Sequence, residues 1–286
     1  MSDTEFQPGA NETTEAVVQS SRRITPESTE EVRQIVLRID ESAFYFLEGQ
    51  NIGVLVPGPH DFGNKYHHRY YTIANARALD GGVELELLVR RCFYIDEVSG
   101  EQYPGVASNY LCDAQEGSRL TITGPYRSPF KIPVDPSSNL LMLGTGTGVA
   151  PFRAFMRRIY EEHKGWKGKV CLFYGARNGM DLLYMNDLNA DLAQYYDENT
   201  FKAIQAVRSG ILSDEADALA QGVADNAEEV WTLLQDDKTH VYLAGMKKIA
   251  DTFDQAMART AGSEAEWQAV KERLIDARRW TELTYI

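Results

Sequence analysis

The sequence is poor in cysteine. Only Cys92, Cys112 and Cys171 occur among 286 residues, and no two of them form a Cys-x-x-Cys pair. An odd and scattered set argues against a disulfide framework and is typical of a reducing compartment such as the cytoplasm. Three thiols also fall short of the four that an iron–sulfur cluster normally takes. We therefore expect a cytoplasmic protein with no metal site of its own.

Long apolar runs and a basic excess are also lacking. No run of ~18 apolar residues and no basic segment followed by an apolar leader is present, so neither a membrane span nor a secretory signal is expected. Up to residue 136 the chain has 12 Lys and Arg against 20 Asp and Glu, and beyond it 17 against 22. Because both halves are acidic and the net charge is −13, nucleic acid is not expected as a partner.

The length and the local composition predict two domains after a short arm. Residues 1–28 are rich in Ser, Thr, Glu and Gln, which predicts a disordered N-terminal arm. Residues 29–136 contain short alternating apolar segments, such as "EVRQIVLRI" and "SRLTITGPY", separated by Gly- and Pro-bearing turns. That pattern favours an antiparallel β-barrel or sandwich.

Residues 137–286 alternate strands with helices. "NLLMLG", "KVCLFYGAR", "FKAIQAV" and "THVYLAG" are typical of buried strands. The expected helices are "FRAFMRRIYEEH", "LYMNDLNADLAQYY", "AEEVWTLLQ" and "MKKIADTFDQAMART". This alternation predicts an α/β domain with a parallel sheet that helices cover on both faces.

Two glycine-bearing turns are candidate phosphate sites. Gly144, Gly146 and Gly148 lie between a predicted strand and a predicted helix, where backbone N–H groups can approach a phosphate. Their spacing differs from the usual Gly-x-Gly-x-x-Gly fingerprint, and a purely structural turn is the alternative. Gly105 opens a second candidate helix, "GVASNYL". Two such helix starts, one in each domain, suit two nucleotide cofactors.

The stretch "RYYT", residues 69–72, combines a cation, aromatic rings and a hydroxyl in one predicted strand. Side chains alternate along a strand, so Arg69 and Tyr71 share one face while Tyr70 and Thr72 share the other. Such a set can neutralise a pyrophosphate, stack on a flat heterocycle and hydrogen-bond to a ring nitrogen. Packing of the tyrosines in the core is the alternative.

Taken together, these motifs resemble the plant-type ferredoxin–NADP reductase family over about residues 31–286. The matching segments are "RYYT", "LVRR" with Tyr94, "GVASNYL", "GTGTGVAPFR", "FYGARN", "YLAGMK" and a Trp five residues before a Tyr near the C-terminus. The resemblance implies an antiparallel barrel that carries FAD, followed by an α/β domain that carries NADP(H). It implies an FAD-dependent oxidoreductase that transfers electrons between NADP(H) and a one-electron carrier protein such as ferredoxin or flavodoxin.

The resemblance also implies roles for individual residues. Arg69 would pair with the flavin pyrophosphate, Tyr71 would stack on the isoalloxazine, and Thr72 would lie near flavin N5. Tyr285 would cover the other flavin face and yield to the nicotinamide. The candidate catalytic residues are Thr72, Glu282 and Tyr285. The remaining FAD candidates are Tyr70, Leu88, Val89, Tyr94, Val106, Ala107 and Ser108. The candidates for the nicotinamide nucleotide are Arg90, Thr145, Thr147, Ala176, Arg177, Arg208, Ser209, Gly245 and Met246.

The chain departs from the family pattern at three places. Ala244 stands where the family usually has Cys, and Leu283 stands where it has a Glu, with Glu282 as the nearest carboxylate. A register shift that moved Glu282 into that place would displace Tyr285. Arg208 and Ser209 reverse a Ser-Arg pair that reads the 2′-phosphate, and the segment "SDEADALAQGVAD" lacks a second cation. We therefore expect a weakened preference for NADPH over NADH.

Two other functions stay open from the sequence. The chain can be the reductase component of a multi-component oxygenase, with an iron–sulfur protein as its partner, or a flavin-binding sensor without turnover. A carrier protein would dock on basic residues. The candidates for that surface are Arg22, Arg23, Arg90, Arg91, Lys247, Lys248, Arg278 and Arg279.

Overall fold

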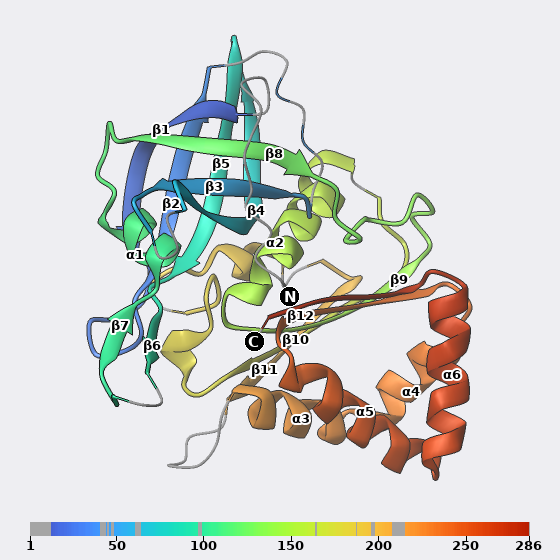
Figure 1. Cartoon of the computed structure of the whole chain (residues 1–286). Coiled ribbons are helices and arrows are strands. Elements are labelled where there is room, and N and C mark those ends of the chain that lie inside the picture. Colours follow the sequence, from blue (N-terminus) through green and yellow to red (C-terminus); the bar gives the residue numbers. More distant parts are fainter. Residues whose placement is uncertain are drawn as a thin grey trace. The chain divides into compact units, whose positions relative to one another are not determined.

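The structure of the protein is a computed structural model. It describes the chain except residues 1–12, 41–43, 45, 47–48, 61–63, 97–98, 164, 187, 196–197, 208–214 and 286. The chain divides into two compact units, Met1–Ser128 and Pro129–Ile286 (Figure 1). The boundary therefore falls at Ser128 and not at the expected residue 136. No helix among the described residues is long and apolar enough to cross a membrane.

The first unit is a closed barrel of antiparallel strands in the order β1-β2-β5-β4-β3-β8, and β8 pairs with β1. The strands are β1 (Thr13–Arg23), β2 (Val32–Ile39), β3 (Asn51–Pro57), β4 (Tyr66–Leu79), β5 (Gly82–Arg90) and β8 (Arg119–Tyr126). A closed barrel leaves no unpaired sheet edge. The predicted antiparallel barrel is thus confirmed.

The expected disordered arm over residues 1–28 is wrong for its described part. β1 pairs with both β2 and β8, and it buries Ala16 and Val18 in the barrel core. Its polar residues lie on the other face of the strand, which made the composition resemble that of a disordered segment. Residues 1–12 lie outside the described part of the chain.

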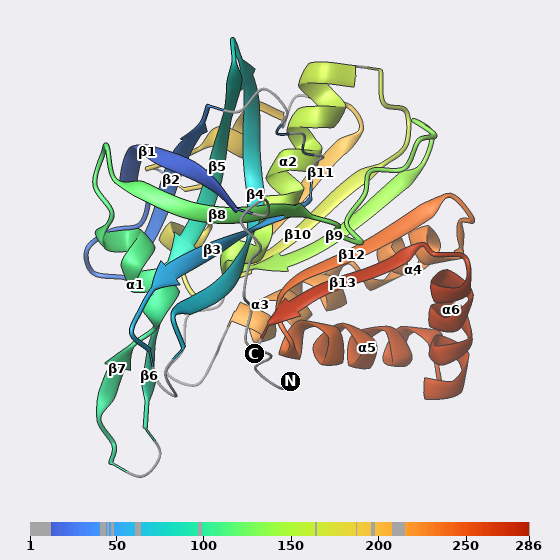
Figure 2. The same ribbon diagram turned by 45° about the horizontal axis from the view of Figure 1, so that its top comes forward.

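A hairpin and a helix follow β5. The hairpin consists of β6 (Phe93–Ile95) and β7 (Gln102–Pro104), and it leads through Gly105 into α1 (Val106–Asp113). In Figure 2 the hairpin extends away from the barrel strands, next to α1. The helix predicted from "GVASNYL" is confirmed. It packs on the barrel through Leu111 and Cys112.

The second unit is a parallel sheet in the order β11-β10-β9-β12-β13. Its strands are β9 (Asn139–Thr145), β10 (Val170–Ala176), β11 (Phe201–Val207), β12 (Thr239–Met246) and β13 (Trp280–Tyr285). The helices are α2 (Ala150–Arg157), α3 (Glu215–Asp225), α4 (Ala227–Gln235), α5 (Lys248–Ala261) and α6 (Glu264–Asp276). The predicted parallel sheet is confirmed.

Alternate residues of the strands pack against different helix layers. Leu141 and Leu143 of β9 belong to one core with α3, α4, α5 and α6. On the opposite face, a Cβ on Gly144 would lie 2.9 Å from the Phe152 ring of α2. Tyr242 likewise meets the Phe155 ring of α2 edge-on at 5.2 Å. Helices therefore cover both faces, as a parallel sheet requires.

One helix prediction is wrong, and two helices were missed. The helix expected over residues 183–196 is replaced, in its described part, by turns and a 3-10 turn at Asp191–Tyr195. The Asn186 side chain accepts hydrogen bonds from the N–H groups of Leu188 and Asn189, which favours a turn over a helix. Conversely, α3 and α6 are helices that the sequence pattern did not predict.

Candidate functional site

The "RYYT" residues of β4 divide into an exposed and a partly buried pair. Arg69 and Tyr70 are exposed, whereas Tyr71 and Thr72 are partly buried. Tyr71 packs against the barrel core, and burial raises the pKa of its hydroxyl. Thr72 Oγ1 donates a hydrogen bond of 2.8 Å to Asn51 Oδ1 on β3. Its hydroxyl is therefore held in one orientation, by a partner that the sequence did not reveal.

Tyr70 belongs to a small aromatic group on the outside of the barrel. Its ring meets the rings of His68 and Tyr126 edge-on, with centroids 4.7 Å and 4.8 Å away. At 53% exposure Tyr70 keeps one side of its ring open to solvent. The exposed ring of Tyr70 is available for contact with a ligand, whereas Tyr71 also packs against the barrel core.

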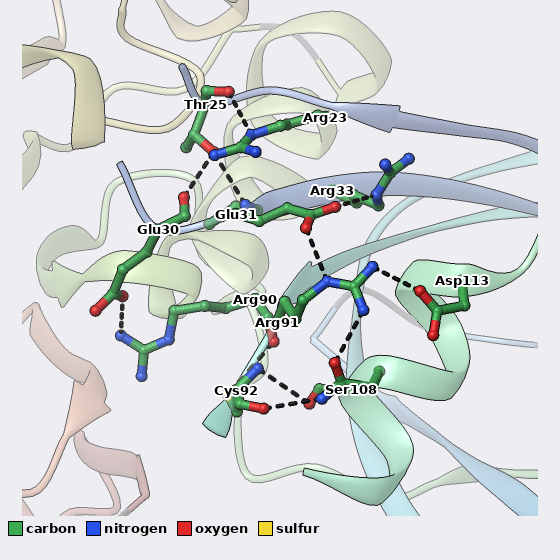
Figure 3. Close-up of polar contacts among 12 residues, drawn as sticks. Arg23, Thr25, Glu30, Glu31, Arg33, Arg90, Arg91, Cys92, Ser108 and Asp113 are labelled. Carbon is green, nitrogen blue, oxygen red and sulfur yellow. Dashed lines mark hydrogen bonds and ion pairs between the residues drawn. The ribbon is translucent and has the colours of Figure 1, made fainter. Parts of the chain in front are cut away.

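The residues that follow β5 contact α1 and the glycine before it through several hydrogen bonds (Figure 3). The Cys92 N–H donates to Ser108 Oγ at 3.1 Å, and Ser108 Oγ donates to the Gly105 carbonyl at 3.2 Å. The Ser108 hydroxyl is thus engaged in two hydrogen bonds within the protein. No side chain caps the N-terminus of α1. Its first-turn N–H groups, including those of Val106 and Ala107, are the groups that can reach an anion.

The other candidates of the first unit lie near this helix. Leu88 and Val89 are buried side chains, so that only their backbone can meet a ligand. Arg90 forms an ion pair of 3.1 Å with Glu30. Tyr94 is exposed and stacks on Tyr103 across the hairpin, with ring centroids 5.5 Å apart. Tyr103 was not among the predicted residues, because only strand pairing brings it beside Tyr94.

The carboxyl ends of β9 and β12 meet at the point where the strand order reverses. From β9 the chain continues to β10 on one side, and β12 lies on the other, which is where open α/β sheets bind ligands. A Cβ on Gly148 would lie 2.2 Å from the Ala244 carbonyl oxygen, and Gly245 has a φ of +136°. The turn after β9 therefore crosses β12 at a distance that only glycine allows.

Thr145 lies directly beneath this crossing. Its side chain is fully buried, and its Oγ1 has no hydrogen-bond partner among the described residues. A Cβ on Gly245 would lie 2.6 Å from that Oγ1. A buried hydroxyl without a partner costs about 1–3 kcal/mol. Such a group fits a site whose polar ligand supplies the missing hydrogen bond.

Further candidates of the second unit share the same sheet edge. Ala176 ends β10 and is buried, and Arg177 follows it and is exposed. Thr147 and Met246 are partly buried. Arg208 and Ser209 lie outside the described residues, and so does the side chain of Tyr285, the last residue of β13. Asp217 lies in the first turn of α3 and forms a 3.0 Å ion pair with Lys248.

The structure gives Glu282 a place away from the expected relay. β12 and β13 pair without a register shift, with Leu243 opposite Glu282 and Ala244 opposite Leu283. The Trp280 indole N–H donates to Glu282 Oε1 at 2.6 Å, and Lys271 Nζ of α6 lies 4.0 Å from the same oxygen. Because neighbouring residues of a strand face opposite sides, Glu282 cannot replace the missing Glu at Leu283. The prediction of a catalytic Glu282 has no geometric support.

Most of the basic residues proposed for docking have partners inside their own unit. Arg23 donates to the carbonyls of Thr25, Pro26 and Thr29. Arg91 and Arg279 form ion pairs, with Glu31 and Asp237 respectively. Lys247 and Arg278 are exposed.

Among the described residues, no group of three or more His, Cys, Asp or Glu could hold a metal ion.

The chain thus consists of a closed antiparallel barrel followed by a parallel α/β unit with a glycine turn at its switch point, where open α/β sheets bind ligands. Residues 142–255 match the family model described as "Oxidoreductase NAD-binding domain". The ferredoxin–NADP reductase of Spirulina sp. is 33% identical over 262 residues, which cover 89% of this chain and 88% of that protein. The enzyme of Thermosynechococcus vestitus is 37% identical, with coverage of 89% and 68%. The chain belongs to the ferredoxin–NADP reductase family.

Two further comparisons define the extent of this likeness. The reductase of Synechocystis sp. is 35% identical, and the chain spans 63% of its length. A solved structure, the ferredoxin–NADP+ reductase from Plasmodium falciparum, has a TM-score of 0.74 at 17% identity, covering 97% of this chain and 98% of that one. That structural likeness supports the fold of both units.

Proposed function

We propose that this protein is an FAD-dependent reductase that transfers electrons between NADP(H) and a one-electron carrier protein, with ferredoxin as the first candidate. The observation that carries the proposal is the crossing of Gly148 over β12, above the unsatisfied Thr145 hydroxyl, in a chain of this family. FAD supplies the redox chemistry, because a flavin accepts a hydride and passes electrons on singly. The protein binds and orients the cofactors.

In the first unit, Arg69 pairs with the FAD pyrophosphate and the first turn of α1 offers its N–H groups to the same anion. Tyr71 and the exposed Tyr70 present aromatic rings to the flavin, and Thr72 presents a hydroxyl that Asn51 already orients. Leu88 and Val89 contribute backbone groups only. Tyr94, with Tyr103 stacked beside it, supports the adenine end.

In the second unit, the turn with Thr145 and Thr147 receives the pyrophosphate of NADP(H). Ala176, Arg177, Gly245 and Met246 line the same edge of the sheet. Arg208 and Ser209 contact the 2′-phosphate, and Tyr285 gives way to the nicotinamide. Asp217 is neutralised by Lys248 and does not repel a phosphate strongly. A moderate preference for NADPH follows.

The electron carrier docks on basic residues of the protein, among which Lys247, just after the carboxyl end of β12, is an exposed cation. Attraction between such residues and an acidic carrier weakens as salt screens it. Flavodoxin is a second carrier of the same chemistry. Free thiols at Cys92, Cys112 and Cys171 support a reducing compartment such as the cytoplasm.

Stopped-flow reduction tests this function. NADPH should bleach the flavin of the purified protein within seconds, and NADH should do so more slowly. Cytochrome c reduction should then depend on added ferredoxin. A flavin that stays oxidised with both nucleotides would overturn the proposal, and efficient turnover without any carrier would overturn the assignment of the partner.

A further inference from the structure

Arg91 lies at the centre of an ion-pair network that the candidate site does not use directly (Figure 3). The residue follows β5, and its guanidinium makes three hydrogen bonds. Nε donates to Glu31 Oε2 at 2.7 Å, Nη1 to Asn109 Oδ1 at 2.9 Å and Nη2 to Asp113 Oδ1 at 2.8 Å. Two of these partners belong to α1, and the third directly precedes β2. The side chain of Arg91 is only 18% exposed.

Glu31, the partner of Arg91 in the barrel, is fixed by further contacts. Glu31 is 17% exposed and also pairs with Arg33 at 2.5 Å. The segment before it is fixed by hydrogen bonds from Arg23 to three carbonyls, and by Thr25 Oγ1, which donates to the Glu30 carbonyl. The Arg91 N–H also donates to the Glu31 carbonyl at 2.9 Å. Arg91 therefore joins α1 to a rigid part of the barrel.

At the helix, Arg91 offsets an unfavourable charge. Asp113 is the last residue of α1, where the helix dipole disfavours a carboxylate. No basic residue lies in the last turn of α1 itself. A planar guanidinium that binds Asn109 and Asp113 together fixes both the charge and the rotation of this short helix. The N–H groups at its other end are then fixed in direction as well.

We infer that Arg91 is a positioning residue for the FAD pyrophosphate: it aims the N-terminus of α1 at the anion without touching it. The inference rests on the proposed function of the same site. Arg33 provides a matched control, because it binds the same Glu31 carboxylate and the first-strand residue Ser21 but no residue of α1.

The test measures the Kd of FAD for apoprotein by flavin fluorescence, together with the ³¹P spectrum of the bound pyrophosphate. Arg91→Met should raise the Kd about tenfold or more, since it removes several charge-assisted hydrogen bonds. Arg91→Lys should recover only part of the affinity, because an ammonium cannot bind Glu31, Asn109 and Asp113 in one plane. Arg33→Met should stay within about twofold of the parent and keep its ³¹P shifts, because its contacts do not include α1.

The milder substitution Asp113→Ala keeps the test decisive if Arg91→Met does not fold. Asp113 is 70% exposed, so the barrel should tolerate its loss, and the ³¹P shifts should still move. Equal effects of Arg33→Met and Arg91→Met would overturn the inference, as would unchanged ³¹P shifts in both Arg91→Met and Asp113→Ala. If the parent apoprotein itself does not bind FAD, the proposed function fails instead, which separates the two failures.

Discussion

The candidate sites of the two units are built in different ways. In the barrel, side chains around the site are held by other side chains: Asn51 orients Thr72, and Arg91 connects Glu31 with α1. At the sheet edge of the second unit, the site consists of glycine backbone that crosses β12 and a buried Thr145 hydroxyl with no partner among the described residues. A preassembled site suits a cofactor that stays bound, and an incomplete site suits a nucleotide that binds and leaves.

The largest expected effect concerns the preassembled barrel site. Arg69→Ala should weaken FAD binding by about 1.5–3 kcal/mol, because it removes a charge-assisted pair with the pyrophosphate. FAD content after dialysis and the Kd of FAD for the apoprotein measure this loss. Arg77→Ala is the control, since Arg77 lies on the same strand and its guanidinium pairs with Glu84 of β5. A full FAD complement in Arg69→Ala would show that the barrel site lies elsewhere.

The next largest effect is expected in the second unit, where a methyl group added at Gly148 should lower both stability and nucleotide binding. Gly148→Ala places a Cβ 2.2 Å from the Ala244 carbonyl oxygen, and backbone on both sides must shift. We expect a loss of stability of about 1–3 kcal/mol, together with weaker NADP+ binding. Gly179→Ala is the matched control, because no atom lies within 4 Å of its added Cβ. Chemical denaturation and an NADP+ titration of both variants check the difference, and equal behaviour would contradict a tight crossing.

The contrast between the two units can be tested with the same substitution, Thr→Val, at Thr145 and at Thr123. We expect the change in stability to have opposite signs at the two positions. Thr145→Val removes a buried hydroxyl without a partner, so the protein without nucleotide should become more stable by about 1 kcal/mol while nucleotide binding weakens. Thr123 Oγ1 in the barrel instead lies 3.0 Å from His68 Nε2. Thr123→Val should therefore lower stability by about 1 kcal/mol. Denaturation curves that move in the same direction for both variants would remove the contrast between the units.

The sequence predicted the regular parts of both units for physical reasons. Alternation specified the barrel strands, and apolar runs between helices specified the parallel sheet. β1 was missed because it buries little more than Ala16 and Val18, and its stability depends on the pairing with β2 and β8. The segment around Asn186 was predicted as a helix, but it forms a turn. Hydrogen bonds between the Asn186 side chain and backbone N–H groups compete with helix formation there.

Site residues could be predicted only where a local motif carries them. "RYYT" and the glycine turn are contiguous, so their positions followed from the sequence. Arg91 has partners 60 and 22 residues away in the chain, and no local pattern reveals them. The position of Glu282 depended on the register between β12 and β13, which side-chain packing decides. Residue types alone could not decide whether this carboxylate faced Trp280 or the nucleotide.

The smallest expected effect is a pH dependence, to which each unit contributes one histidine. Burial lowers the pKa of His68 in the barrel, and the charge of His67 lowers it further. Burial likewise lowers the pKa of His240 on β12, with the charge of Arg279 acting in the same direction. An unfolded histidine has a pKa of about 6.5, so below that pH the unfolded chain binds more protons than the folded one. Stability from both groups is therefore present above pH ~6.5 and is lost as the pH falls through the lower folded values.

Paired substitutions separate the two contributions. Between pH 7.5 and pH 5.5 the Tm of the parent should fall, and His68→Gln and His240→Gln should each reduce that fall by about 1–2 °C. The double variant should reduce it by the sum, because the two residues lie in different units and have no common partner. A single variant that loses more stability on acidification than the parent would reverse the sign of the argument. A reduction for only one of them would assign the acid sensitivity to that unit alone.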